Sequence, residues 1–152
     1  MTQIKTNQEL VVKNVLSFRG KVNNMELQRI VGDMDETVKE LGAVTVGNPI
    51  TATFGVEEDL LDVEVFLPID RVVENTKNYF FKEMLKIVNA VVISYKGNPI
   101  GLQDACNELN QYIMKNCMQP ITVGYNLTKH VDPQNPDNTE IDVYVGISPN
   151  VL

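Results

Sequence analysis

The chain has 152 residues and a net charge of −7, and 43% of the residues are hydrophobic. This composition is typical of one globular domain with a proper core. The acidic balance and scattered basic residues argue against a nucleic-acid partner, which needs a basic face. No apolar run approaches the roughly 20 residues of a membrane span, and residues 1–5 lack the apolar segment of a signal peptide. We therefore expect a cytoplasmic protein with no membrane partner.

The pattern of the chain occurs twice. Residues 10–69 follow the order strand, helix, strand, strand, and residues 84–148 repeat it after a connector at 70–83. Each copy opens with an apolar run that ends in Ser, an aromatic residue, a basic residue and Gly, at 17–20 and 94–97. Two similar units can pack face to face and leave a cleft that binds a ligand. We therefore predict one α+β domain over residues 1–152, built from duplicated β-α-β-β units.

The first copy has clear local signals. Asn23 followed by Glu26 resembles a capping box, and Gly42 suits a left-handed helix end, so the pattern predicts a helix over 24–41. Strands are expected at 11–19, 50–55 and 60–68. In the connector, residues 70–75 could form a helical turn. The cluster 79–81 is either a hydrophobic plug over the core or the wall of a ligand cleft.

The second copy has similar local signals for its helix, strands and loop. Asn98 is a good helix cap and Pro99 suits the first helical position, so a helix should follow and fade near Lys115. Strands are expected at 84–96, 121–128 and 139–147. The segment 132–138 consists of turn-forming residues, and we interpret it as a loop.

These residues resemble the GyrI-like (gyrase-inhibitory-protein-like) effector-binding family. The resemblance covers about residues 10–148 and rests on the order and spacing of 95–99, the helix after it, 121–125, the Asp-Pro turn and 139–145. It implies pseudo-twofold symmetry, a curved antiparallel sheet with helices on one face, and a cleft between the two copies. The family supplies small-molecule domains to multidrug-responsive regulators and includes proteins that inhibit gyrase.

The chain departs from this family at two points. Drug-sensing members usually carry a Glu two residues before the Tyr that follows the second helix, and this chain has Val123 there. A buried carboxylate is what compensates a lipophilic cation in an apolar cleft, so we expect cations to bind weakly. Hydrolytic members rely on that Glu and a Trp, and this chain has no Trp. The resemblance therefore implies a binding protein rather than a hydrolase.

Matching aromatic residues of the two copies are the candidate ligand-binding residues. Flat aromatic walls suit a planar ligand, although ordinary core packing would also explain them. Two acids, Glu64 and Asp142, stand at what we interpret as equivalent strand positions and could line the same cleft. The predicted ligand-binding set is Phe18, Phe54, Glu64, Phe66, Tyr95, Tyr125, Asp142 and Tyr144. No cofactor, metal ligand or catalytic residue is predicted, and His130, the one histidine, is expected at the surface.

Three functions remain open at this point. The leading one is a non-catalytic domain that binds a small apolar or aromatic ligand. The alternative is an acidic adaptor or inhibitor with a protein partner, which the net charge of −7 favours slightly. A hydrolase comes last, because Glu64 or Asp142 would have to supply its carboxylate.

Overall fold

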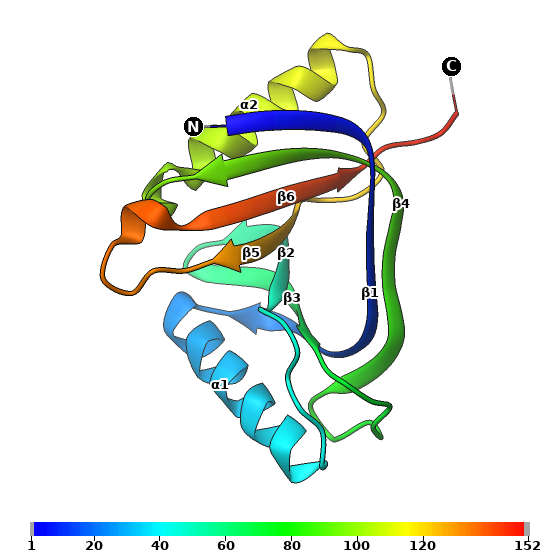
Figure 1. Cartoon of the computed structure of the whole chain (residues 1–152), viewed down its shortest axis with the longest axis vertical. Helices are drawn as coiled ribbons and strands as arrows, with labels where there is room; N and C mark the ends of the chain where they lie inside the picture. Colours follow the sequence, from blue (N-terminus) through cyan, green and yellow to red (C-terminus); the bar gives the residue numbers. More distant parts are fainter. Residues whose placement is uncertain (1, 151–152) are drawn as a thin grey trace. The chain divides into compact units, whose positions relative to one another are not determined.

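The computed structural model describes residues 2–150, which form two compact units. One unit is Val11–Lys86, and the other joins residues 2–10 to residues 87–150. The strands β1 (Thr2–Val22) and β4 (Phe80–Lys96) each contribute residues to both units (Figure 1). Each unit has the order strand, helix, strand, strand, and all strand pairs described below are antiparallel. The fold class is α+β with curved antiparallel strands, as predicted.

The unit Val11–Lys86 places one helix on one face of three paired strands. The helix α1 spans Asn24–Glu40, and the strands after it are β2 (Ile50–Glu57) and β3 (Leu60–Pro68). Strand β3 lies between β1 and β2 and pairs with both. Met34 and Val38 of α1 pack in a buried cluster with apolar residues of the sheet, among them Leu16, Val65 and Leu67.

Local signals explain where α1 begins and ends. The Asn23 side chain accepts a hydrogen bond of 2.8 Å from the Glu26 backbone N–H, which satisfies one of the free donors of the first turn. Gly42 has φ = +78°, a conformation that glycine adopts without the steric cost of a Cβ atom. The predicted helix is therefore confirmed to within one residue at its C-terminal end.

The connector between β3 and β4 is held by side-chain hydrogen bonds instead of the expected helical turn. Asp70 accepts from the Val44 backbone N–H at 2.8 Å, and Asn75 accepts from the Phe81 N–H at 2.8 Å. The prediction of a turn of helix at 70–75 is therefore wrong. Tyr79 is buried in the α1 cluster, whereas Phe80 remains 53% exposed, so only part of the aromatic cluster acts as a plug.

The second unit repeats the arrangement with α2 (Leu102–Lys115). A short 3-10 helix, η1 (Pro99–Gly101), precedes α2, and the Asn98 side chain caps it by accepting from the Ile100 N–H at 3.0 Å. The remaining elements are β5 (Tyr125–His130), η2 (Pro136–Asn138) and β6 (Glu140–Gly146), and β6 pairs with both β4 and β5. Leu109 and Ile113 of α2 pack against inward-facing residues of β4 and β6.

Several strand boundaries differ from the predictions, among them the start of β4, which is Phe80 and not residue 84. The strand expected over 121–128 begins only at Tyr125, because the Thr122 hydroxyl accepts from the Gly146 N–H at 2.8 Å and takes the place of a backbone partner. Strand β1 begins at Thr2 rather than near residue 11. Its first residues belong to the unit that contains α2, where Ile4 packs against the core and the Thr2 hydroxyl bonds Glu108 at 2.7 Å.

Candidate functional site

Each unit has one sheet face that its helix does not cover, called here the helix-free face. Side chains of a strand alternate between faces. In Val11–Lys86, Leu16, Val65 and Leu67 pack against α1. Their neighbours Ser17, Glu64 and Phe66 therefore point to the helix-free face. The register sets Arg19 opposite Glu64 and Ser17 opposite Phe66, so these four residues form two adjacent cross-strand pairs.

Charged groups on this face are paired with one another and with aromatic rings. The Lys82 Nζ lies 2.7 Å from the Glu64 Oε2, whose side chain is only 14% exposed. The Arg19 Nε lies 3.0 Å from the Asp62 Oδ1, and this hydrogen bond lowers the pKa of the Asp62 carboxyl. The two cations also lie over rings: the Arg19 guanidinium 3.8 Å from the Phe54 centroid, and the Lys82 ammonium 5.0 Å from that of Phe66.

A β-bulge places Phe54 beside Arg19. Thr53 pairs with Val63 and Gly55 with Asp62, so Phe54 is an extra residue with no partner on β3. A bulge re-aims a side chain and increases the local twist. Phe54 is 37% exposed, in contrast to Phe66, which is 2% exposed.

Phe18 lies apart from the other predicted residues of this unit. It is on the helix side of the sheet, where it packs against the α1 cluster, and its ring centroid is 6.3 Å from that of Tyr79. The structure therefore brings Phe54, Glu64 and Phe66 to one face and Phe18 to the other.

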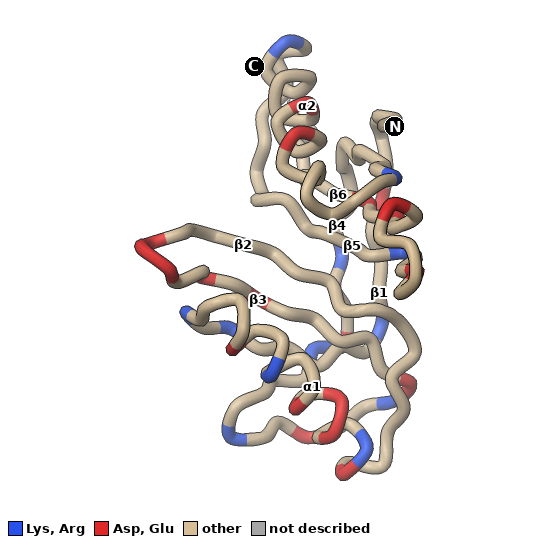
Figure 2. Tube along the Cα trace, turned by 90° about the vertical axis from the view of Figure 1, so that its left-hand side faces the viewer, with Lys and Arg blue, Asp and Glu red and all other residues tan. Residues whose placement is uncertain are grey.

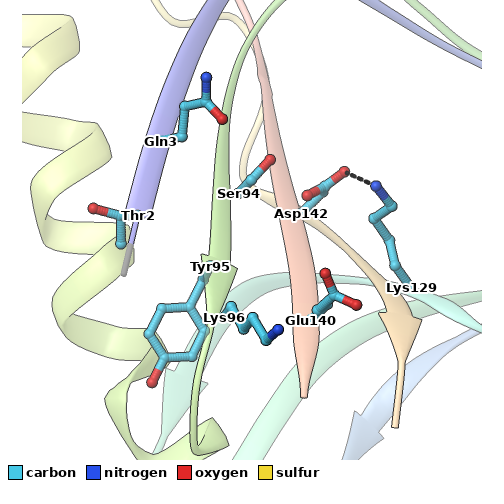
Figure 3. A pocket seen from close by; sticks show the side chains of 8 residues that line it. All are labelled: Thr2, Gln3, Ser94, Tyr95, Lys96, Lys129, Glu140 and Asp142. Atoms are coloured by element: carbon cyan, nitrogen blue, oxygen red, sulfur yellow. Dashed lines mark ion pairs between the residues drawn. The ribbon is translucent and has the colours of Figure 1, made fainter. Parts of the chain in front are cut away.

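The second unit has a comparable helix-free face. Tyr125 of β5 stands directly opposite Tyr144 of β6, and Ser94 of β4 stands opposite Asp142 (Figure 3). The Asp142 side chain is 11% exposed and lies 3.7 Å from the Nζ of Lys129. Lys129 is the extra residue of a second bulge, between Thr128 and His130. Burial raises the pKa of the Tyr144 hydroxyl, and the Asp142 charge adds to this effect.

A cavity of about 420 Å³ opens beside Asp142. The residues that line it all carry a polar group and come from the start of β1, the end of β4, and the strands β5 and β6 (Figure 3). Tyr95 borders this cavity, but its ring points away from Asp142 and its hydroxyl donates to the Asn98 carbonyl at 2.5 Å. Tyr95, like Phe18, also packs against its helix-side core.

Glu64 and Asp142 do not occupy equivalent positions in the strand pairings of the two units. Glu64 pairs with Arg19, the basic residue of its motif, whereas Asp142 pairs with Ser94, the serine of the other motif. Glu140, which pairs with Lys96, is the residue that corresponds to Glu64. The predicted equivalence of Glu64 and Asp142 is therefore wrong by two residues. Sequence alternation could not reveal this error, because a shift of two residues along a strand leaves the side chain on the same face.

The sequence interpretation missed the cations of both faces. Arg19 occupies the third place of the repeated Ser-aromatic-basic-Gly motif, two residues after Ser17, so period-two alternation could have placed it on the helix-free face. Lys82 and Lys129 carry no such signal, because Lys82 pairs across the sheet and Lys129 lies in a bulge.

Outside the two helix-free faces, the charged residues are scattered over both units. Short Lys and Arg segments alternate with Asp and Glu in both units (Figure 2). Within residues 2–150, no three His, Cys, Asp or Glu side chains come together in a way that could hold a metal ion. No helix in the same range combines the length and apolarity that crossing a membrane requires.

Known structures share this architecture although the sequences have diverged. No protein-family model matches the chain, and no curated protein matches it in sequence. The crystal structure of the EcmrR C-terminal domain superposes with a TM-score of 0.78 at 17% identity, over 97% of both chains. The chain has the fold that the GyrI-like resemblance implies. The predicted resemblance is confirmed at the level of the fold.

Other structures that share this fold come from proteins of different kinds. EcmrR in its DNA complex superposes with a TM-score of 0.83 at 18% identity, and the chain covers 57% of its length. A hydrolase from Listeria innocua gives 0.61 at 12% identity, over 97% of this chain and 91% of the other. SAV2435 bound to tetraphenylphosphonium gives 0.53 at 8% identity, over 98% and 94%. Identities this low establish the fold alone.

Proposed function

We propose that the chain is a non-catalytic domain that binds a small apolar or aromatic ligand on its helix-free faces. One observation carries the proposal: each helix-free face sets aromatic rings beside a mostly buried carboxylate that already has a lysine partner. The Phe66 ring lies under Lys82 of the Glu64–Lys82 pair, and the Phe54 ring lies under the neighbouring Arg19. Tyr144 is two residues from Asp142 on β6. The tetraphenylphosphonium complex of SAV2435 supports small-molecule binding by this fold.

The paired carboxylates favour an uncharged ligand. A lipophilic cation needs an acid whose charge is not already compensated, because a charge buried without a partner is costly. Glu64 lies 2.7 Å from Lys82 and Asp142 lies 3.7 Å from Lys129, so a cation would have to displace a lysine. Val123 also stands where drug-sensing members of the family that the sequence resembles carry Glu. We therefore infer a neutral aromatic ligand.

The same pairing argues against acid–base chemistry at these two residues. A general acid or base must exchange a proton with the substrate, and both carboxylates are held by lysines in the structure. If the chain were a hydrolase that used them, Glu64→Gln and Asp142→Asn would abolish turnover. Unchanged turnover in both variants would remove these two acids from any catalytic role.

The proposal is tested by thermal unfolding of the full chain with two probes of similar shape. Triphenylphosphine oxide is neutral and tetraphenylphosphonium is a cation. A ligand at about 100 times its Kd adds roughly 2.7 kcal/mol of stability, which corresponds to roughly 5–10 °C in Tm for a domain of this size. We expect the neutral probe to give the larger shift.

The variant Lys82→Met sharpens this test. It removes the closer of the two cations paired with Glu64 and keeps the length of the side chain, while an Arg19 guanidinium nitrogen remains 4.0 Å from the carboxylate. We therefore expect tetraphenylphosphonium to bind more tightly to the variant. Lys129→Met makes the same test at Asp142 and shows which unit holds the ligand. Lys13→Met, at an exposed position of β1, is the matched control and should leave both affinities unchanged.

Two results would contradict the proposal. One is a cation that binds the unmodified chain as tightly as the neutral probe. The other is a panel of neutral aromatics in which no compound raises Tm. In the second case, a protein that co-purifies at fixed stoichiometry would favour the acidic adaptor instead, and the net charge of −7 suits a basic partner.

A further inference from the structure

A second cavity lies beside α1 in the unit Val11–Lys86. Its volume is about 590 Å³, larger than the cavity of Figure 3 and within the usual range of small-molecule sites. Its lining includes Phe18 and Tyr79, which lie on the helix side of the sheet, together with Arg29, Ile30 and Asp33 of α1. The residues argued above for the proposed function, Phe54, Glu64 and Phe66, do not line it.

The aromatic part of this cavity is held in place. The rings of Phe18 and Tyr79 lie 6.3 Å apart at 58°, a tilted arrangement that aromatic pairs favour. The Tyr79 hydroxyl donates to the Asp33 carboxylate, and the Tyr79 N–H donates to the Thr76 hydroxyl at 3.1 Å. Tyr79 is 5% exposed, so this wall is part of the packed structure rather than a mobile side chain.

The polar part of the cavity carries an excess of positive charge. Arg19, Arg29 and Lys77 line it, against a single acid, Asp33. Asp33 follows Arg29 by four residues on α1 and could pair with it, but its Oδ2 accepts the Tyr79 hydroxyl instead. Among residues 2–150, neither Arg29 nor Lys77 forms an ion pair, whereas Arg19 is held by Asp62. A local positive cavity in a chain of net charge −7 needs an explanation.

We propose that this cavity is a binding site for a planar aromatic anion, such as an aryl carboxylate. The ring would lie against Phe18 and Tyr79, and the anionic group would face Arg29 and Lys77. Aromatic walls with a few convergent polar groups are the usual composition of a small-molecule site, and guanidinium and ammonium groups are the donors that bind carboxylates. The site shares Arg19 with the helix-free face of its unit, but its other lining residues are separate, and it would bind a ligand of different charge.

The first experiment compares 2-naphthoate with its neutral analogue 2-naphthalenemethanol. Each is titrated into the ¹⁵N-labelled full chain, and amide chemical shifts report both the affinity and the place of binding. We expect saturable shifts at residues 29–33 and 77–80. The carboxylate should bind about tenfold more tightly than the alcohol, because only the carboxylate can pair with the two exposed cations.

A matched pair of double variants tests the role of the two cations. Arg29→Gln with Lys77→Gln removes two exposed charges from the cavity, and Lys13→Gln with Lys86→Gln removes two exposed charges from the same unit elsewhere. All four positions are exposed, so both proteins should fold. We expect the first pair to weaken 2-naphthoate binding about tenfold and the second to change it less than about twofold.

Three results would overturn the site. They are equal affinity for the two naphthalene compounds, equal weakening by the two double variants, and the absence of saturable shifts at residues 29–33 and 77–80 at millimolar 2-naphthoate. Each result is measured from the amides of residues 29–33 and 77–80, so binding of the neutral compound to the helix-free faces would be reported by other amides, and the variants leave Glu64, Lys82, Asp142 and Lys129 intact. Failure here is therefore distinguishable from failure of the proposed function.

Discussion

At the scale of single residues, Tyr95 links the end of β4 to the turn that leads into η1 by a hydrogen bond. Its hydroxyl donates to the Asn98 carbonyl at 2.5 Å. A Cβ atom on Gly101 would lie 2.3 Å from that hydroxyl oxygen, and one on Gly97 would lie 2.8 Å from it. Both glycines are therefore needed for the close approach of Tyr95. This contact gives Tyr95 a structural role in addition to its place at the edge of the cavity in Figure 3.

The variant Gly101→Ala tests this contact. We expect it to lower the free energy of unfolding by about 1–3 kcal/mol, the usual cost of overpacking, as measured by urea denaturation. In a Tyr95→Phe background the hydroxyl is gone, so the same substitution should cost less. Gly32→Ala is the control, because nothing lies within 4 Å of its Cβ position in α1, and it should stabilise the helix by up to about 1 kcal/mol. An equal cost of Gly101→Ala in both backgrounds would contradict the assignment.

At the scale of elements, Asp70 joins the end of β3 to the segment that follows α1. Its carboxylate accepts from the Val44 N–H at 2.8 Å, and its own N–H donates to the Val44 carbonyl at 3.0 Å. The hydrogen bond from Arg71, and then that from Val44, lower the pKa of Asp70 to about 2. The unfolded chain has an ordinary Asp pKa near 3.9, so the folded state binds the proton more weakly.

This difference in pKa predicts a pH dependence with a definite sign. The ionised Asp70 contributes its stability in full above about pH 4, and the contribution is lost as the pH falls towards 2. The destabilisation caused by Asp70→Asn should therefore shrink over that interval, as measured by urea unfolding at several pH values. Asp59→Asn, in the turn between β2 and β3, is the control for removal of one negative charge. A pH-independent effect of Asp70→Asn would show that the carboxylate does not act through its charge.

The elements differ in how far the sequence could predict them. Both helices were predicted because their signals are local: Asn23 and Gly42 bound α1, and Asn98 and Pro99 begin the short 3-10 helix that leads into α2. The first residues of β1 were missed because their partners lie far along the chain, as in the bond between Thr2 and Glu108.

The residues of the candidate site also divide into those that a local pattern could predict and those that depend on distant partners. Alternation was enough to suggest Glu64, Phe66 and Tyr144, but it did not separate Phe18, which lies on the other face of the sheet. The cations were missed because their partners are distant: Arg19 binds Asp62, 43 residues away, and Lys82 binds Glu64, 18 residues away. Register and bulges decide these pairs, and neither is encoded in a local pattern.

At the scale of the whole molecule, the two units share their longest strands. Residues 2–10 of β1 belong to one unit and the rest of β1 to the other, and β4 is divided in the same way. Loss of structure in one unit therefore frees half of each shared strand. Strand β3 then depends on a β1 that is anchored over only part of its length. We expect the two units to unfold in one cooperative step.

Leu109→Ala tests this coupling. Leu109 is 1% exposed in the core beneath α2, so truncation should cost about 2–5 kcal/mol. If unfolding is cooperative, hydrogen exchange at Val65 and Leu67, in the other unit, should lose the same protection as exchange at Val143. Val88→Ala, at a position that is 67% exposed, should change none of these rates by more than the equivalent of about 0.5 kcal/mol. Protection that falls at Val143 and stays unchanged at Val65 would show that the units unfold separately in spite of the strands they share.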